Sequence, residues 1–427
     1  MWINRDKETK TVEKRTDMEN KKLTKLEKYW IMYDVGNSAF VMLIATIIPI
    51  YFNYLAKSAG ISEVNYLAYW GYAASVSTVI VALIGPVLGS IADTQNYKKP
   101  LFTISMMVGV LGCAVMSFPT SWVVFLAVFV IAKVGYNASL IFYDSMLVDI
   151  TSADRMDEVS SQGYAWGYIG SCIPFILSLV LVLMYEKIGI TMRMAMTGAF
   201  FLNAVWWAVV TIPLLRNYRQ KNYVAMSSHS VKNSFKRLGQ TFMDVHKEKK
   251  IFWYLLAFFF FIDGVYTIIE MATAYGSALG LDSTGLLLAL LVTQLVAFPC
   301  ALICAKLSGK YPTERLIGVC IVAYIGIALF AIQLDKQWEF WTLAVLVGMF
   351  QGAIQALARS YFAKIIPAEK SGEYFGIYDI CGKGASFMGT TLVGIVAQVT
   401  GVANAGVAVI AVLFVIGYIL FKKAVRA

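Results

Sequence analysis

A short polar connection between two apolar runs reads Gly89-Ser-Ile-Ala-Asp93-Thr-Gln-Asn-Tyr97-Lys98-Lys99-Pro100. The run before it covers residues 66–91, and the run after it covers residues 101–118. A helix needs about 20 apolar residues to cross the hydrocarbon core of a bilayer, and both runs are close to that length. A charged turn of a few residues between two such runs predicts a helical hairpin that enters a membrane and leaves it again.

The same pattern continues along the whole chain. Of its 427 residues, 59% are hydrophobic and only 15% are charged, whereas a soluble domain carries about 25% charged residues. Apolar runs can be placed at residues 30–56, 66–91, 101–118, 122–148, 162–185, 192–215, 251–279, 284–306, 316–332, 338–363, 373–398 and 402–421. We therefore predict an all-α integral membrane protein with twelve transmembrane helices, and not a soluble enzyme.

The net charge of +10 reflects which side of the membrane each loop faces. Most of the 36 Lys and Arg residues lie in the N-terminal arm (residues 1–29), in the even-numbered loops and in the C-terminal tail (residues 422–427). Positive residues concentrate in cytoplasmic loops, so we expect both termini in the cytoplasm. A nucleic-acid partner is not expected, because the basic residues form no soluble basic face. Short loops favour a bacterial plasma membrane.

One long basic connection, residues 216–250, divides the runs six and six. It predicts an N-terminal bundle at residues 30–215, a C-terminal bundle at residues 251–421 and, between them, an amphipathic surface helix within residues 231–245. Traces of an internal repeat relate the bundles, since Asp144-Ser145 matches Arg359-Ser360, and Tyr164 and Tyr168 match Tyr374 and Tyr378. Two pseudo-symmetric six-helix bundles are typical of transporters.

The connection from Gly89 to Pro100 resembles the cytoplasmic loop signature of the major facilitator superfamily, although Gln95 stands where that signature usually has Arg. More specific motifs lie in five other runs. They are Tyr33-Asp34-Val-Gly36-Asn37-Ser38-Ala39-Phe40, Gly163-Tyr-Ala-Trp166-Gly167-Tyr168-Ile-Gly170, Asp263-Gly264-Val265-Tyr-Thr267-Ile268, Gln351-Gly352-Ala-Ile-Gln355-Ala356-Leu-Ala-Arg359-Ser360 and Glu373-Tyr-Phe375-Gly376-Ile-Tyr378. Together they resemble the unknown-major-facilitator family, which also contains the autophagy-linked vacuolar amino-acid effluxers of fungi. The resemblance implies the twelve-helix transporter fold and amino-acid efflux.

Ionisable side chains inside the apolar runs indicate where function resides. Such a group is costly in a bilayer, so it normally faces a partner or a water-filled cavity. Eight are present: Asp34, Lys133, Asp144, Asp263, Glu270, Arg359, Asp379 and Lys383. In the superfamily fold, runs 1, 4, 7 and 10 line the central cavity, and six of these eight residues lie on those runs. We therefore expect most of the charges to face this cavity.

A zwitterionic solute would suit this set of charges, because Arg359 and Lys133 can meet a carboxylate while Asp263 or Glu270 meets an ammonium group. The predicted substrate-binding residues are Asn37, Lys133, Tyr136, Asn137, Asp263, Thr267, Glu270, Gln351, Gln355 and Arg359. Asp263 and Glu270 are also the predicted proton-coupling residues, because a carboxyl group in a low-dielectric cavity binds a proton more readily.

A second set of charges is predicted to form a gate between the bundles on the cytoplasmic side. The gating residues are Asp34, Asp93, Lys98, Lys99, Asp144, Arg359, Asp379 and Lys383. An ion pair of Arg359 with Asp144 or Asp34 would break when that side opens. For Asp379 and Lys383, four residues apart, a pair within one helix is an equal alternative. Asp34 could instead anchor the first span.

These observations predict a monomeric secondary transporter that uses alternating access and proton coupling to move a small polar or zwitterionic solute, best an amino acid. Two alternatives stay open: proton-coupled efflux of cationic drugs or other metabolites, and a membrane sensor or scaffold that does not transport. No catalytic residues, metal site or cofactor are predicted. The six Cys lie in apolar runs, and both His lie in one polar loop.

Overall fold

The computed structural model describes residues 22–225, 239–241, 243–278, 281, 283–401 and 403–427. Within these residues, twelve helical segments are long and apolar enough to cross a membrane. Each overlaps one of the twelve runs placed from the sequence, so the predicted all-α membrane class is confirmed. Residues 1–21 of the predicted N-terminal arm, and most of the surface helix predicted within residues 231–245, lie outside the described residues.

The twelve segments form two halves. The N-terminal half contains α2 (Lys25–Ala45), α3 (Ile47–Ser58), α4 (Glu63–Ala92), α5 (Lys98–Val115), α6 (Trp122–Ser145), α7 (Leu147–Ile150), α8 (Met156–Leu183), α9 (Tyr185–Ile188) and α10 (Met192–Asn217). The C-terminal half contains α12 (Lys249–Ala278), α13 (Ser283–Ser308), α14 (Thr313–Ile332), α15 (Gln337–Ile365), η1 (Ala368–Lys370), α16 (Ser371–Thr400) and α17 (Ala403–Arg426). α2 with α3 makes the first span, and α6 with α7 makes the fourth.

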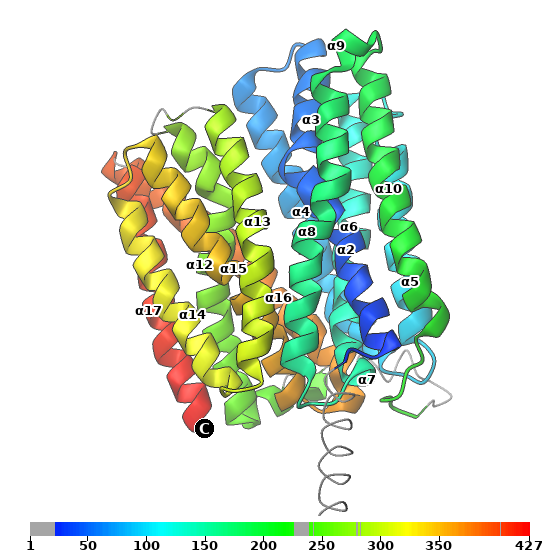
Figure 1. The fold of residues 1–427 in the computed structure, drawn as a ribbon, viewed down its shortest axis with the longest axis vertical. Helices are drawn as coiled ribbons and strands as arrows, with labels where there is room; N and C mark the ends of the chain where they lie inside the picture. Colours follow the sequence, from blue (N-terminus) through cyan, green and yellow to red (C-terminus); the bar gives the residue numbers. More distant parts are fainter. Residues whose placement is uncertain (1–21, 226–238, 242, 279–280, 282, 402) are drawn as a thin grey trace, which may run out of the picture.

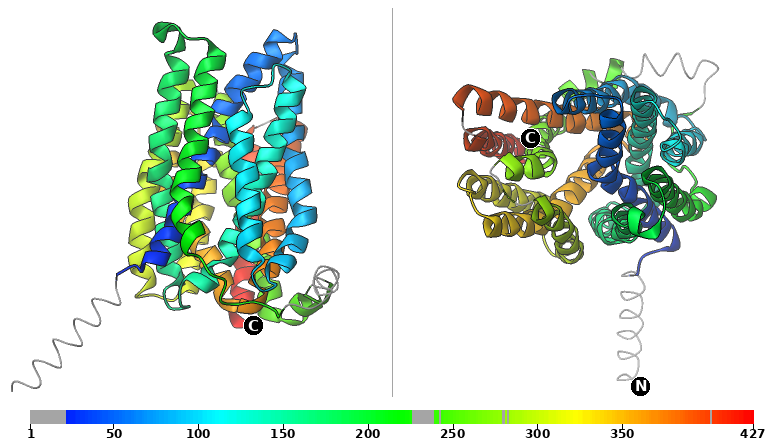
Figure 2. Two further views of the ribbon diagram at one scale, coloured as in Figure 1. Left: turned by 90° about the vertical axis from the view of Figure 1, so that its right-hand side faces the viewer. Right: turned by 90° about the horizontal axis from the view of Figure 1, so that it is seen from above.

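The two halves stand side by side, and the view along the bundle separates them most clearly (Figures 1 and 2). They contact each other where α4 packs on α16 and where α8 packs on α13 and α15. The described part of α2 begins at the same end of the molecule at which α17 finishes (Figure 1). We call this the terminal end. It also contains α7 and the loop between α4 and α5.

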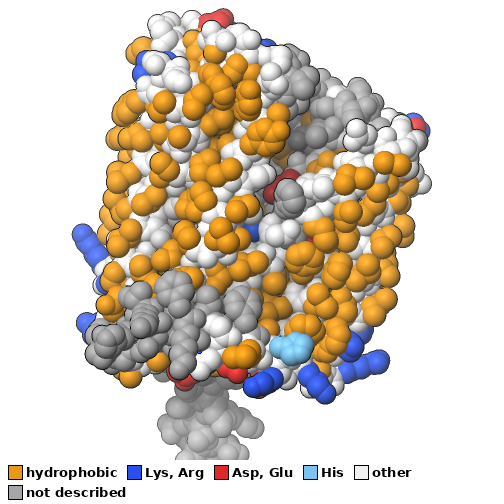
Figure 3. Space-filling model, turned by 180° about the vertical axis from the view of Figure 1, so that it is seen from behind, with side chains coloured by type: hydrophobic (Ala, Val, Ile, Leu, Met, Phe, Trp, Pro, Cys, Tyr) orange, Lys and Arg blue, Asp and Glu red, His pale blue; other side chains and the backbone are white. Residues whose placement is uncertain are grey.

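The outer surface is apolar, which is the reverse of a soluble protein. Leu183 is 68% exposed and Val399 is 81% exposed, whereas Arg359 is only 2% exposed. Hydrophobic side chains cover the wall of both halves in the space-filling view (Figure 3). Lipid chains solvate such a wall without cost, while the backbone hydrogen bonds are satisfied inside each helix. The apolar outer wall therefore fits a bilayer, and Arg359 is kept inside the molecule.

Helix boundaries differ from the apolar runs where polar residues continue a helix. α8 starts at Met156 and not near residue 162, because its first turns are buried against the C-terminal half. α2 starts at Lys25, where Thr24 and Glu27 form a capping box. The first span is interrupted at Thr46, whose backbone leaves the helical region (φ −136°, ψ −69°), three residues before Pro49.

Candidate functional site

Arg359, on α15, joins the two halves near the terminal end. Its guanidinium group donates to Asp144 Oδ1 at 3.0 Å and to Asp34 Oδ2 at 3.3 Å. It also donates to the hydroxyl and the carbonyl oxygen of Ser160, at 2.9 and 3.2 Å. Asn37 supports the carboxylate of Asp34 at 3.4 Å. One cation from the C-terminal half is thus held by three helices of the N-terminal half, in a site that excludes most water.

Aromatic rings enclose the same guanidinium group. Its central carbon lies 4.6 Å from the ring centre of Trp30, 4.5 Å from that of Tyr164 and 5.4 Å from that of Tyr143. Gly163 leaves the space for this arrangement, since a Cβ there would collide with Asp34. Cation–π contacts are strongest when water is excluded. The rings therefore stabilise Arg359 in addition to its two carboxylate partners.

Asp93 forms a second link between the halves. Its carboxylate accepts the backbone N–H groups of Gly372 at 2.7 Å and of Glu373 at 2.9 Å. These are among the first N–H groups of α16, which have no partner within the helix. Asp93 of the N-terminal half therefore caps a helix of the C-terminal half, where the positive end of the helix dipole favours a carboxylate. Ser90 adds a bond to the Glu373 side chain at 3.1 Å.

Glycines allow the backbones of α4 and α16 to meet at this link. A Cβ on Gly89 would collide with the carbonyl oxygen of Gly372. One turn further along, a Cβ on Gly376 would lie 2.6 Å from Pro86 Cα. Real Cβ atoms do not approach backbone atoms so closely, so a larger residue at either place would force the helices apart. The terminal end is closed by backbone contact as well as by charge.

Lys98 is fully buried beneath this contact. Its Nζ lies 3.8 Å from Asp93 and 3.6 Å from Asp149, and it donates to Ser371 of the other half at 2.8 Å. The segment Tyr218–Val224, which follows α10, covers the site, and the side chain of Asp149 accepts several of its bonds. The start of the inter-half connection is thereby fixed to the N-terminal half.

Asp157, in the first turn of α8, makes a third link. It accepts the hydroxyl of Ser360 at 2.5 Å, the hydroxyl of Thr313 at 2.5 Å and the ammonium group of Lys364 at 2.6 Å. All three donors belong to the C-terminal half. Sequence reasoning missed this residue because it placed Asp157 in a loop before the fifth span. The pattern Arg359-Ser360 with Lys364 one turn later could have indicated a partner acid.

Beyond these links the halves separate. A hollow lies between them toward the end away from the termini, and acidic and basic side chains are visible in it (Figure 3). Lys133 of α6 interacts electrostatically with Glu270 of α12 and with Lys383 of α16. Lys383 also forms an ion pair with Asp379 on its own helix. Charges of both signs and from both halves thus gather away from the closed end.

Polar and aromatic residues lie between the charged hollow and the closed end. Gln355 donates to the hydroxyl of Tyr168 at 3.3 Å, which links α15 to α8, and it donates to the carbonyl of Gln351 at 3.1 Å. Tyr136 is half-buried, with its ring centre 5.5 Å from that of Phe40. Asn137 is 5% exposed.

Asp263 and Thr267 take a different position from the one expected. Both are fully buried, and the carboxylate of Asp263 accepts the backbone N–H of Gly389 at 3.0 Å and the hydroxyl of Thr267 at 3.2 Å. Its other oxygen is buried and has no hydrogen-bond partner among the residues that the structure describes. The pair thus lies between α12 and α16, inside the C-terminal half. Neither side chain is exposed in this structure.

The predicted gating residues separate into three groups. Arg359 is brought together with both acids proposed as its partners. Lys98 makes the inter-half contacts, while Lys99 is half-buried and forms no ion pair among the described residues. Asp379 and Lys383 pair with each other within α16, which is the alternative that their spacing left open.

The sequence matches the family described as "Vacuole effluxer Atg22 like" over residues 24–426. The chain belongs to this family. A relative from Bacillus subtilis (strain 168), described as the MFS-type transporter YxiO, is 41% identical over 405 residues, which cover 94% of this chain and 95% of the relative. Autophagy-related protein 22 of Cryptococcus neoformans is 26% identical over 296 residues, and the match covers 64% of this chain and 53% of the fungal protein.

Solved structures similar to this Atg22-like chain are major facilitator transporters. FucP in its outward conformation has a TM-score of 0.71 at 11% identity, with 94% of this chain and 97% of FucP covered. A bacterial homologue of the iron transporter ferroportin, in an outward-facing state, has a TM-score of 0.69 at 14% identity, with 95% and 99% covered. The fold is therefore that of the major facilitator superfamily, and the predicted family and fold class are confirmed.

One prediction for this Atg22-like transporter concerns pH. Burial raises the pKa of Asp93 to about 7, although Lys98 and the N–H groups of Gly372 and Glu373 favour its charged form. In a hydrated, open state the pKa of an Asp is about 3.9. The closed state therefore binds the proton more tightly, so lowering the pH from 8 toward 5.5 is expected to favour closure of the terminal end.

Spin labels on Arg216→Cys and Lys310→Cys, both exposed at the terminal end, would report this change as an inter-half distance in an otherwise cysteine-free protein. The shorter distance should gain population as the pH falls. Asp93→Asn carries no titrating proton and should abolish the dependence, whereas Glu369→Gln, at an exposed position of the same end, should keep it. A pH response that persists in Asp93→Asn would contradict the assignment to Asp93.

Proposed function

We propose that this chain is a proton-coupled secondary transporter that moves a small polar or zwitterionic solute, best an amino acid, by alternating access. The family description names vacuole effluxers, which supports an export role. The geometry supports the mechanism, because one end of the molecule is sealed between the halves while the other end is hollowed. The structure corresponds to the state in which the hollow faces away from the terminal end.

The observation that carries the proposed substrate class is the group formed by Lys133, Glu270 and Lys383. These charges come from both halves and influence one another electrostatically, and Asp379 forms an ion pair with Lys383 within α16. Lys133 on α6 and Glu270 on α12 carry opposite charges and belong to opposite halves. A solute with a carboxylate and an ammonium group would match both and would draw the halves together.

Arg359 plays another part in this scheme. In the closed state its donors are taken by Asp34, Asp144 and Ser160, so it is not free to bind a substrate. When the terminal end opens, these bonds break and the guanidinium group becomes available to a carboxylate. Arg359 would then contact the solute only during release at the terminal end.

Asp263 is the proposed proton-binding residue. In the described part of the chain, one buried oxygen of its carboxylate has no hydrogen-bond partner, and such a group is stabilised by protonation. Because it joins α12 to α16 through Gly389, loss or gain of the proton would change the packing of two helices that border the hollow. Glu270 is the second candidate, since it is exposed and can exchange protons directly with water.

We place the terminal end in the cytoplasm, because most of the basic residues lie in the segments at that end. A bacterial plasma membrane is the proposed location, and the similarity of YxiO from Bacillus subtilis supports it. The bundle boundaries at residues 30–215 and 251–421 belong to the same proposal, as does a monomeric transporter.

Purified protein in liposomes, supplied with a panel of labelled amino acids and a pH gradient, tests this function. We expect saturable flux of at least one amino acid that grows with the proton gradient. Flux of cationic drugs without amino-acid flux would show that the substrates are cationic drugs and not amino acids. Absence of flux across both panels would favour a sensor or scaffold that does not transport.

Substitution of the two proposed proton-binding residues, Asp263 and Glu270, should change transport in different ways. In Asp263→Asn the unpartnered oxygen no longer titrates, so transport should continue down a solute gradient but lose its response to pH. Glu270→Gln should weaken apparent affinity, since one of the two charges for a zwitterion is lost. Glu369→Gln, an exposed acid remote from the hollow, should behave as the wild type. Full pH dependence retained in both Asp263→Asn and Glu270→Gln would refute the assignment.

A further inference from the structure

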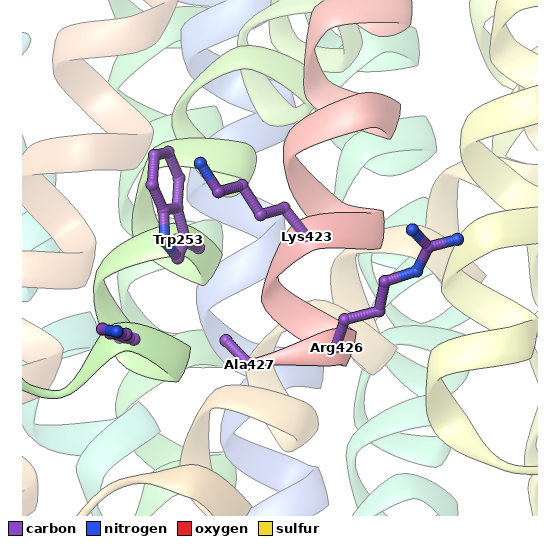
Figure 4. Close-up of a pocket in the computed structure, with 5 residues that line it drawn as sticks. Trp253, Lys423, Arg426 and Ala427 are labelled. Carbon is purple, nitrogen blue, oxygen red and sulfur yellow. The ribbon is translucent and has the colours of Figure 1, made fainter.

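A basic pocket lies at the terminal end of the C-terminal half. It has a volume of about 390 Å³ and is lined by Lys249, Trp253, Lys423, Arg426 and Ala427. Its residues come from the start of α12 and the end of α17 (Figure 4), two helices that pack along each other. The pocket is separate from the hollow between the halves and from the three links that close the terminal end.

The lining of this pocket suits an anion. Three of its five residues carry a cationic side chain, and none carries a carboxylate side chain. Lys423 Nζ lies 3.4 Å from the ring centre of Trp253, so the indole holds this ammonium group at the edge of the pocket. Figure 4 shows Lys423 beside Trp253 on one side of the end of α17 and Arg426 on its other side. All three cations are exposed to the surroundings.

The surface that leads to the pocket suits acyl chains. Val412, Val415 and Ile419 are 56%, 43% and 62% exposed on α17. Their spacing of three and four residues places these three side chains on one helical face. Lys423 and Arg426 follow at the end of the helix, one on each side of it (Figure 4). In the space-filling view, basic side chains gather at the bottom edge of the apolar wall (Figure 3). An apolar stripe on α17 thus ends in a cationic pocket at the terminal end.

We propose that this pocket binds the phosphate of an anionic phospholipid, with the acyl chains lying along the stripe of α17. A free phosphate would use only the cations, whereas a phospholipid uses both the cations and the stripe. Trp side chains are favoured at the membrane interface, and Trp253 supplies the ring that positions Lys423. A cytoplasmic position of this end would by itself explain an excess of basic residues there. It would not explain why three of them line one pocket at the end of an apolar stripe.

Native mass spectrometry of the full-length detergent-solubilised protein tests the proposal, with phosphatidylglycerol and phosphatidylcholine of equal chain length as probes. Phosphatidylglycerol is expected to bind more tightly. A variant with Lys249→Ala, Lys423→Ala and Arg426→Ala should lose about tenfold or more of that affinity, since each Lys or Arg near an anionic surface contributes about a factor of five. Lys249→Arg with Lys423→Arg keeps the charges and should retain binding.

The matched control removes three other basic residues that are exposed at the same end, namely Arg216, Lys310 and Arg315. It loses the same net charge and should bind phosphatidylglycerol like the wild type. Equal loss in both triple variants would overturn the proposal, because the effect would then be one of net charge. Displacement of phosphatidylglycerol by millimolar inorganic phosphate would also overturn it, since the site would then take free phosphate.

Discussion

Arg359→Ala is expected to open the terminal end and to abolish most transport. The variant removes the cation that pairs with both Asp34 and Asp144, and it leaves two carboxylates in a site with little access to water. Breaking a buried pair by removing one partner costs about 3–5 kcal/mol. The open state hydrates both acids, so the cost falls on the closed state. The ratio of closed to open protein should drop by roughly a hundredfold or more.

Cys304 offers a native reporter for this change. It is 6% exposed on α13, and its sulfur lies 3.9 Å from the hydroxyl of Ser161 on α8, between the halves. With the other five Cys replaced, maleimide should label Cys304 slowly in the wild type and at least about tenfold faster in Arg359→Ala. Arg359→Lys should lie between them, because an ammonium group cannot donate to both acids in the same planar geometry.

A matched substitution is Arg315→Ala, which removes an exposed Arg at the same end. It should leave both the labelling rate and the flux unchanged. If Arg359→Ala labels and transports like the wild type, Arg359 does not hold the terminal end closed.

Gly89→Ala is expected to have the second large effect, through steric exclusion alone. The added methyl group would occupy the position of the Gly372 carbonyl oxygen on α16. A backbone atom cannot rotate away as a side chain does, so α4 and α16 must separate. This separation would lengthen the bonds from Gly372 and Glu373 to Asp93. The closed state becomes inaccessible, and a cycle that must pass through it should stop.

Gly71→Ala is the matched control on the same helix, since a Cβ at Gly71 meets nothing within 4 Å. It should transport and label like the wild type. Gly89→Ala should show fast labelling of Cys304 and flux near background. Normal flux in a folded, monodisperse Gly89→Ala protein would contradict closure by backbone contact at this position.

The spans and the charges within them could be predicted from the sequence, because each depends on local composition. Twelve apolar runs appear as twelve spans. The acids nearest to Arg359 could be named because few charges lie inside spans, and these must find partners. Lys98 and Lys99 point to different sides of a helix because they are adjacent. The sequence does not show which of these two sides faces the other half. Lys98 donates to Ser371 of the other half, whereas no ion pair of Lys99 is found among the described residues.

Contacts between distant segments could not be read from the sequence in the same way. Asp157 precedes an apolar run and looked like part of a loop, but it is buried by α14 and α15. Asp263 was expected in the cavity because its helix borders it. Gly389 removes the side chain that would otherwise fill the space beside it, so the carboxylate turns toward α16. The position of a buried carboxylate thus depends on the residues of the helix packed against it, which the local sequence does not show.

A reversible cross-link between the halves tests whether the terminal end must open for transport. Ser161→Cys would place a second sulfur beside Cys304 across the α8–α13 contact, in a protein without other Cys. Oxidation should join the halves and stop amino-acid flux in liposomes, and reduction should restore it, while Ser161→Cys without Cys304 should be unaffected by oxidation. Full flux in the cross-linked protein would show that transport does not require the terminal end to open.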